Sequence, residues 1–433
     1  MALERGCVET AEAVKLAMKA FRDDDAATFR QLLDRYPALR SRINEPAGDF
    51  DSPLITRVRS RAMLDALLDA GADINARSNW WAGGFGLLDS ADGDLSAYAI
   101  ERGALVTVHA AARLGMLEKL EEMLHGGPEL VRARGGDGQT PLHFASTVAV
   151  AELLLERGAD IDARDVDHES TPAQYMVRTR PEVARHLIRR GCKTDILLAA
   201  ALGDPGLVRE HLDADPECVG MRVSDEYFPM AGSGKGGGTI YQWELGWYVS
   251  ACQVARAFGY ADIADLLMER SPAGEKLLNA CWFHDREMVN SLLAQDPNLA
   301  ESLRAAGRRH AAHAARNRDT IACRLMLEAG LPVDEYSQHH ATALHWAAWQ
   351  GNVELVRTIL AHDPPLEDDS NDYRGTPLDW ALHGSENAWP REEGAHAATV
   401  EALLEAGAVP PQSLRGAAEV QQVLGRYLPR GSN

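Results

Sequence analysis

Histidines gather in the last third of the chain, where their imidazole groups could act as acids, bases or metal ligands. Of the fifteen histidines, eight lie from residue 310 onward. His310 and His313 are spaced so that a helix would place both rings on one face. A zinc site would need a third and a fourth ligand, and the sequence contains no His-Glu-x-x-His motif. We therefore expect no metal site and no cofactor.

Four residues near the C-terminus combine imidazole and carboxylate groups in a way that suits acid–base catalysis. They are His339, His383, Asp379 and Glu386. A positioned histidine or a partly buried carboxylate can transfer a proton in hydrolysis, isomerisation or elimination without a redox cofactor. The alternative for Asp379 is a hydrogen bond that caps a helix or joins two repeats. No Gly-x-Ser-x-Gly motif and no cysteine in a nucleophile context is present, so a hydrolase triad is not indicated.

A glycine-rich segment resembles a phosphate-binding loop only in part. It contains Gly232-x-Gly234-x-x-Gly237. A dinucleotide site needs this pattern between a strand and a helix, and no such context is visible. A P-loop needs serine or threonine after its lysine, whereas Gly236 follows Lys235. We interpret the segment as a flexible hinge, with Lys235 able to meet an anionic ligand only if the loop folds over a groove.

A repeated pattern supplies the elements that must position these side chains. Gly-Gln-Thr-Pro-Leu-His begins at residue 138, and related stretches return at 342–345 and 375–378. A Leu-Leu pair followed by Gly-Ala ends successive units, as at 67–72 and 403–408. Threonine caps a helix whose first turn accepts proline, and glycine allows the left-handed end of the next helix. The pattern predicts amphipathic helix pairs that bury their faces by stacking on one another.

This order of motifs resembles the ankyrin repeat, and residues 344–349 and 380–386 are similar to a set of bacterial ankyrin-repeat proteins. The resemblance implies an all-α ankyrin-repeat solenoid of about eleven helix-pair units, with hairpin loops and terminal caps. It also implies that His143 and His345, which occupy the histidine position of the repeat, bridge neighbouring repeats by hydrogen bonds. Ankyrin arrays serve many purposes, so the fold alone assigns no activity.

Three insertions interrupt the repeat, at 78–95, 218–246 and 385–396. We expect an N-terminal ankyrin-repeat array over 1–217, an insertion or finger loop over 218–246, and a C-terminal array with a capping helix over 247–433. Long loops on a repeat array usually cluster on one face, often the binding face. The insertions could therefore cover a groove, or they could be neutral additions.

In ankyrin arrays the hairpin tips and the residues four and five places after the histidine position line the concave face. The resemblance therefore implies a groove in the later repeats that is rich in aromatic side chains. Its predicted ligand- or partner-binding residues are Trp247, Phe258, Trp282, Phe283, Trp349, Gln350, Tyr373 and Trp389. Trp346 and Trp380 lie one place after the histidine position and are expected to pack between helices. Exposed tryptophans need a cover, which could be a partner, a small ring-bearing ligand or the insertions.

The composition limits the compartment and the partners. The chain has 44 Lys and Arg against 64 Asp and Glu, a net charge of −20. This charge disfavours nucleic acid or an anionic membrane as the main partner. No apolar run is long enough to cross a membrane, and the first residues lack the order of a secretory signal. The six cysteines are scattered without a Cys-x-x-Cys motif, which is typical of reduced thiols. We expect a cytoplasmic, bacterial protein.

The leading functional hypothesis is a binding protein that recognises a partner through the aromatic and histidine-rich groove of its C-terminal repeats. The partner would be a protein or a small-molecule ligand. The alternative is a cofactor-independent acid–base enzyme (a hydrolase, isomerase or lyase), or a protein that binds a small molecule such as a sugar. Either would use the same groove, roofed by the insertions. A closed pocket of roughly several hundred Å³, with a histidine and a carboxylate within hydrogen-bond reach, would favour the enzyme. An open groove without such a pair would favour the binding protein.

Overall fold

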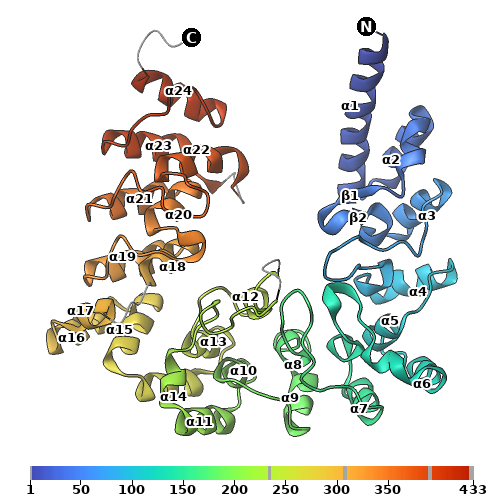
Figure 1. Cartoon of the computed structure of the whole chain (residues 1–433), viewed down its shortest axis with the longest axis horizontal. Helices are drawn as coiled ribbons and strands as arrows, with labels where there is room; N and C mark the ends of the chain where they lie inside the picture. The colour runs from blue at the N-terminus through green and yellow to red at the C-terminus, as the bar shows by residue number, and fades with distance from the viewer. Residues whose placement is uncertain (1, 233–235, 306–309, 389–392, 429–433) are drawn as a thin grey trace. The chain divides into compact units, whose positions relative to one another are not determined.

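The computed structural model of the chain describes residues 2–232, 236–305, 310–388 and 393–428. The chain divides into two compact units, an N-terminal unit of Met1–Leu202 with Val223–Gly246 and a C-terminal unit of Gly203–Arg222 with Trp247–Asn433. Both units are built from short helices that pack in pairs (Figure 1), so the predicted all-α class is confirmed. The predicted domain limits at 217 and 246 stay a prediction.

The N-terminal unit consists of one long helix, α1, and shorter helices, which are joined by turns, irregular loops and one small β-hairpin. Its α-helices are α1 (Ala2–Arg22), α2 (Ala26–Arg35), α3 (Arg61–Asp69), α4 (Gly93–Glu101), α5 (Val108–Arg113), α6 (Leu117–Gly126), α7 (Val148–Glu156), α8 (Pro172–Tyr175), α9 (Pro181–Arg189), α10 (Ile196–Ala201) and α12 (Tyr241–Glu244). Its 3-10 helices are η1 (Pro37–Arg42), η2 (Asp49–Asp51), η3 (Leu54–Arg57), η4 (Leu87–Asp89), η5 (Pro128–Arg132), η6 (Gly136–Gly138) and η7 (Pro141–Phe144). Strands β1 (Pro46–Gly48) and β2 (Ser52–Pro53) pair antiparallel, with Pro46 opposite Pro53. Helix α1 packs on α2, α5 on α6 and α8 on α9.

The C-terminal unit stacks its helix pairs in sequence order. Its α-helices are α11 (Pro205–Ala214), α13 (Ala251–Ala257), α14 (Ala261–Arg270), α15 (Ala273–Trp282), α16 (Arg286–Gln295), α17 (Leu299–Ala305), α18 (His310–Arg316), α19 (Thr320–Glu328), α20 (Ala343–Trp349), α21 (Val353–Leu360), α22 (Pro377–Asn387), α23 (His396–Glu405) and α24 (Ala418–Tyr427), and its 3-10 helices are η8 (Pro216–Gly220) and η9 (Gln338–His340). Within the stack, α18, α20 and α22 pack side by side, and α19, α21 and α23 form the second layer (Figure 1).

Histidines at the repeat position of two repeats, His143 and His345, tie those repeats to the segments that follow them. Nδ1 of His345 accepts a hydrogen bond from the backbone N–H of Thr342 at 3.2 Å. Nε2 of the same ring lies 3.0 Å from the carbonyl oxygen of Asp368 and therefore donates to it. His143 makes the equivalent pair of contacts, at 3.1 Å each, with the N–H of Thr140 and the carbonyl of Ser170. The predicted bridging role of both histidines is confirmed.

One predicted helix is much shorter in the structure. The Thr-Pro start at residue 140 leads into a single 3-10 turn, η7, and not into an α-helix of the expected length. The guanidinium of Arg180 donates to the carbonyl oxygens of His143 and Ala145, at 3.0 Å each. These bonds replace the helical hydrogen bonds that the two carbonyls would otherwise accept, so the helix can end early.

The core of each unit is made of small and branched apolar side chains. Leu344, Ala347 and Ala348 of α20 are fully buried against neighbouring helices of the C-terminal unit. Leu154 of α7 is fully buried in the N-terminal unit. In the part of the chain that the structure describes, no helix combines the length and the apolar character that spanning a lipid bilayer would require.

Candidate functional site

One cavity of the C-terminal unit gathers aromatic, histidine and charged side chains. Its volume is about 640 Å³. Its lining consists of His339, Trp346, Trp349, Tyr373, Arg374, Gly375, Asp379, Trp380, His383 and Arg415. A cavity of this size lies within the usual range for ligand sites of roughly 300–1,000 Å³. It is therefore the candidate functional site of this unit.

Helical spacing explains how two helices present these side chains. Trp346 and Trp349 are three residues apart on α20, and Trp380 and His383 are three residues apart on α22. Residues with this spacing share one helix face. Because α20 and α22 pack side by side, the two faces meet at the cavity. The hairpins before these helices add His339 and Tyr373.

The aromatic rings form one connected cluster around Trp380. The ring centroid of Trp380 lies 5.4 Å from that of Trp346, 6.3 Å from that of Trp349 and 5.7 Å from that of Tyr373. The interplanar angles of these pairs are 82°, 75° and 69°. Edge-to-face packing of this kind adds stability beyond simple burial. The imidazole of His383 lies 5.3 Å from Trp349 and extends the cluster.

The indole N–H groups of two of these tryptophans already have partners within the protein. Nε1 of Trp346 donates to the hydroxyl of Ser337 at 2.7 Å, and Nε1 of Trp380 donates to Oδ1 of Asn371 at 3.4 Å. These bonds hold the rings in place. What the two tryptophans offer to a ligand is therefore mainly their apolar surface.

The polar groups at the cavity are also engaged with neighbours. Oδ1 of Asp379 pairs with the guanidinium of Arg415 at 2.6 Å, and Oδ2 accepts from the N–H and hydroxyl of Thr376 at 3.2 and 3.1 Å. Asp379 thus makes the capping hydrogen bonds that were predicted as its alternative role. These contacts hold the carboxylate in place. Nδ1 of His339 lies 3.4 Å from Oδ2 of the exposed Asp372.

Five residues proposed from the sequence meet at this cavity. They are His339, Trp349, Tyr373, Asp379 and His383. Glu386 is exposed near the end of α22 and is not among the lining side chains in the described part of the chain. Trp389 lies outside the described residues.

Two of the predicted groove tryptophans are buried elsewhere in the same unit. Trp247 is 7% exposed and its indole N–H donates to Nδ1 of His313 at 3.2 Å. The guanidinium carbon of Arg316 lies 4.4 Å from the centre of the Trp247 ring. Trp282 is 8% exposed and belongs to the hydrophobic core. Both side chains contribute to packing, and their role in partner binding stays a prediction.

The remaining predicted groove residues are also partly or fully buried. Phe258 and Phe283 are half-buried, and the guanidinium of Arg256 lies 4.3 Å from the ring centre of Phe283. Gln350 is buried, and its amide donates to the carbonyl oxygens of Ala315 and Arg316 at 3.1 and 3.0 Å. The aromatic cavity does not include these three side chains among the described residues.

Several cavity residues escaped the sequence analysis. Trp346 and Trp380 were expected to pack only between helices, yet each also lines the cavity. The sequence signal for this second role was their position beside the repeat histidine, because an indole ring there can pack between helices and still face the cavity with one edge. Arg415 lies between α23 and α24, where no repeat pattern indicates which way its side chain is directed.

The histidine pair at the start of α18 is used in packing. The ring of His313 stacks on Tyr248 with centroids 3.5 Å apart and an interplanar angle of 10°. His310 lies edge-on to the same tyrosine at 5.3 Å. Both histidines are buried. Their helical spacing therefore serves the core of this unit.

The described part of the glycine-rich segment packs closely against the loop at 165–170 within the N-terminal unit. The N–H of Gly237 donates to the carbonyl of Asp167 at 2.9 Å, and Nδ1 of His168 lies 2.8 Å from the carbonyl of Gly238. A Cβ atom on Gly236 would lie 2.7 Å from the carbonyl of Asp167, so only glycine fits there. Residues 236–238 thus allow close packing where the sequence suggested a flexible hinge. Gly234 and Lys235 lie outside the described residues.

Family models match two parts of the chain. A model of three ankyrin repeats matches residues 277–368, and a model of one ankyrin repeat matches residues 137–166. The first match includes α20 and the hairpin that carries His339, and the second includes His143. The matched segments therefore contain both histidines that bridge repeats.

Curated relatives align with parts of the chain at low to moderate identity. The E3 ubiquitin-protein ligase KEG of Arabidopsis thaliana is 24% identical over 53% of this chain and 15% of its own length. Protein fem-1 homolog A of Danio rerio is 38% identical over 16% of this chain and 14% of its own length. Palmitoyltransferase ZDHHC17 of Danio rerio is 36% identical over 14% of this chain and 10% of its own length. The chain therefore aligns with a minor part of each relative.

Proposed function

Because the chain is an ankyrin-repeat protein, we propose that it is a binding protein whose aromatic cavity in the C-terminal unit recognises a partner. Ankyrin repeats generally mediate protein–protein interaction. The observation that carries the proposal is the convergence of three indoles, a phenol and two imidazoles on one cavity of about 640 Å³. Aromatic side chains in a partly enclosed site are the usual anchors of recognition.

A protein that inserts an apolar or aromatic side chain is the partner that suits this lining best. The half-buried Trp346 and Trp349 offer apolar surface, and the buried Trp380 packs behind them. The ion pair of Asp379 with Arg415 offers polar contacts beside them. An apolar core with a polar rim is the usual composition of a protein interface. The net charge of −20 supports neither nucleic acid nor an anionic membrane as the partner.

A small ring-bearing molecule, such as a sugar, is the second candidate for the same cavity. The observation that favours it is the presence of His339 and His383 on the lining, with Asp372 at 3.4 Å from His339. Such a pair can orient hydroxyl groups, and in an acid–base enzyme it could transfer protons. The calorimetric titrations and the thermal-shift screen described below separate this candidate from a protein partner.

A reducing compartment suits the described cysteines. Cys192, Cys218, Cys252, Cys281 and Cys323 are free and buried. Burial raises the pKa of Cys281 and Cys323 to about 12, so these thiols react slowly. Buried free thiols of this kind support the proposed location in the cytoplasm.

The test compares two tryptophan variants of the full chain. Trp349 is half-buried at the cavity, whereas Trp243 is 72% exposed on α12 of the N-terminal unit and serves as the matched control. Proteins enriched from a bacterial lysate on the immobilised wild type would be purified and titrated by calorimetry. The Trp349→Ala variant should bind a true partner about tenfold or more weakly, and the Trp243→Ala variant should bind it like the wild type.

A parallel thermal-shift screen covers sugars and other metabolites. A compound that raises the Tm of the wild type and of Trp243→Ala, but not of Trp349→Ala, would move the function to small-molecule binding. If every enriched partner and every compound binds the wild type, Trp349→Ala and Trp243→Ala equally well, the cavity is refuted as the recognition site.

A further inference from the structure

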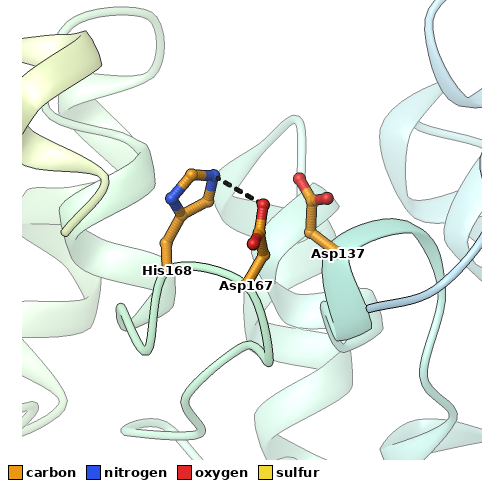
Figure 2. Close-up of side chains that lie close together, drawn as sticks. All are labelled: Asp137, Asp167 and His168. Carbon is orange, nitrogen blue, oxygen red and sulfur yellow. Dashed lines mark ion pairs between the residues drawn. The ribbon is translucent and has the colours of Figure 1, made fainter. Parts of the chain in front are cut away.

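Two carboxylates and an imidazole lie together in the N-terminal unit, far in sequence from the aromatic cavity. Figure 2 shows His168 and Asp167 from one loop beside Asp137 from η6. One ligand-capable atom from each residue lies within 4.8 Å of the others. Nitrogen and oxygen ligands at about 2.0–2.1 Å from a tetrahedral zinc ion lie about 3.4 Å apart, so the widest of the three separations needs to close by at most about 1.4 Å.

Backbone contacts hold the two segments at this separation. The carbonyl oxygen of Asp137 accepts from the N–H groups of Val166 and Asp167, at 2.8 and 3.1 Å. The neighbouring Asp165 accepts from the N–H groups of His168 and Ser170, at 2.8 and 2.7 Å. The three candidate ligands are therefore positioned by the folded backbone.

The orientation of His168 leaves one ring nitrogen for the cluster. Its Nδ1 lies 2.8 Å from the carbonyl oxygen of Gly238 and must carry the hydrogen that is donated to it. Nε2 then presents a lone pair, and Oδ2 of Asp167 lies 3.6 Å away (Figure 2). A second-sphere carbonyl that fixes the tautomer in this way is the common arrangement for a metal-bound histidine.

The carboxylate of Asp167 has one oxygen to spare. Its side chain is 7% exposed, and Oδ1 accepts from the N–H of Gly237 at 3.1 Å. Among the described residues, Oδ2 accepts no hydrogen bond, and its ion-pair contact is the one with His168. Two facing lone pairs in a buried place repel each other unless a cation lies between them.

The charges near the cluster also favour a bound cation. Within the described ranges, no lysine or arginine forms an ion pair with Asp137, Asp165 or Asp167. A bound divalent cation would offset this concentration of negative charge.

We propose that Asp137, Asp167 and His168 form a binding site for a divalent first-row transition-metal ion such as Zn²⁺, with the two carboxylates and Nε2 of His168 as ligands. Two oxygen donors and one imidazole match zinc and manganese better than calcium, which prefers oxygen donors alone. Three protein ligands leave at least one position for water. The spacing of these residues carries no motif, which is why the sequence predicted no metal site.

The bound ion would join η6 to the loop at 165–170, on which part of the segment at 223–246 packs. The N–H of Gly237 already donates a hydrogen bond to the carbonyl oxygen of Asp167, and the carbonyl oxygen of Gly238 accepts one from Nδ1 of His168. Fixing those two side chains on an ion would therefore also secure the segment that packs on them. The expected role is structural, and the prediction includes slower proteolysis within 223–246 when the ion is bound.

The test uses the full chain after removal of metals with a chelator. Zn²⁺, Mn²⁺ and Ca²⁺ are titrated separately by calorimetry, and bound metal is counted by mass spectrometry after equilibrium dialysis. The wild type should bind one Zn²⁺ per chain at this site, with a rise in Tm and weaker binding of Ca²⁺. The variants Asp167→Asn and His168→Gln should bind Zn²⁺ at least about tenfold more weakly and lose the rise in Tm.

A matched control is available in the other unit. Nε2 of His284 lies 2.8 Å from Oδ1 of Asp319, a histidine–aspartate pair without a third ligand in the described part of the chain. His284→Gln should leave the zinc stoichiometry unchanged. Asn at 167 can still accept from Gly237, so circular dichroism of the metal-free variant should match the wild type. If Asp167→Asn fails this check, Asp137→Asn takes its place.

Two results would overturn the proposal. The first is no stoichiometric Zn²⁺ or Mn²⁺ binding by the wild type, which would mean that a proton alone lies between His168 and Asp167. The second is equal zinc affinity in the wild type and in a folded Asp137, Asp167 or His168 variant.

Discussion

Acid should destabilise the N-terminal unit through the buried ring of His143, and a single substitution should remove this effect. His143 is 1% exposed. Its Nδ1 accepts from the N–H of Thr140 and its Nε2 donates to the carbonyl of Ser170, both at 3.1 Å. Protonation would require desolvation of a charge and would replace the acceptor at Nδ1 with a donor. Burial accordingly lowers the pKa of His143 from 6.5 to about 3.

The sign and size of the effect follow from this shift. Below pH 6.5 the unfolded chain binds a proton that the folded chain excludes, so the free energy of unfolding falls as the pH falls, until about pH 3. One pH unit corresponds to about 1.4 kcal/mol per proton. His143 should therefore remove about 1 kcal/mol of stability at pH 5.5 and about 3 kcal/mol at pH 4.5, relative to pH 7.5.

The informative variant is His143→Gln, because the chain itself uses glutamine at this position of other repeats. Oε1 of Gln174 accepts from the N–H of Thr171 at 2.8 Å, and Oε1 of Gln253 accepts from the N–H of Ser250 at 3.0 Å. Glutamine can therefore keep the cap, but it cannot titrate. Loss of the bond to Ser170 should make the variant about 1 kcal/mol less stable at pH 7.5. This deficit should vanish near pH 5.5 and reverse at pH 4.5.

The assay is equilibrium urea unfolding at pH 7.5, 5.5 and 4.5, with hydrogen exchange of α7 and α9 to identify the transition of the N-terminal unit. His125→Gln, at an exposed site on α6 of the same unit, controls for the substitution itself. A constant difference between wild type and His143→Gln at the three pH values would refute the reasoning. So would an NMR titration of the His143 ring with a midpoint above pH 5.

Two further predictions concern stability. Leu154→Ala should lower the free energy of unfolding by about 2–5 kcal/mol, because Leu154 is fully buried. Leu105→Ala, at a side chain that is 70% exposed, should change it little in the same urea assay. Similar losses in the two variants would contradict the assigned core. Arg222 and Glu275 form an ion pair at 3.0 Å with side chains 1% and 6% exposed, so Arg222→Met should cost about 3–5 kcal/mol by removing the guanidinium group from beside a buried carboxylate. The double variant Arg222→Met/Glu275→Leu should regain at least half of that loss, and a double variant as unstable as the single one would count against this explanation.

Local patterns in the sequence were enough to predict the helix pairs and their caps. Thr342 and His345 are three residues apart and bond to each other within one turn, so their roles can be assigned without knowing the rest of the fold. The repeat period then placed Trp349, Asp379 and His383 near one another, because equivalent positions of stacked repeats face the same side. The prediction of an aromatic site in the later repeats rests on this regularity.

Side-chain burial could not be predicted in the same way. Trp247 was expected in the groove, but His313, 66 positions further along the chain, accepts its N–H and fixes it in the core. Trp380 was expected in the packing, but it is also the centre of the cavity cluster. A repeat pattern gives the direction of a side chain, whereas its exposure depends on which distant neighbours cover it.

The amino-acid sequence by itself determined the stacking unit, since caps, periodic apolar faces and bridging histidines act within one repeat or between adjacent repeats. Tertiary structure alone decided the meeting of Asp137 with Asp167 and His168, through the backbone hydrogen bonds that the Asp137 carbonyl accepts. It also decided how the glycines at 236–238 pack on that loop. These contacts join irregular segments, and no period in the sequence records which irregular segments will touch.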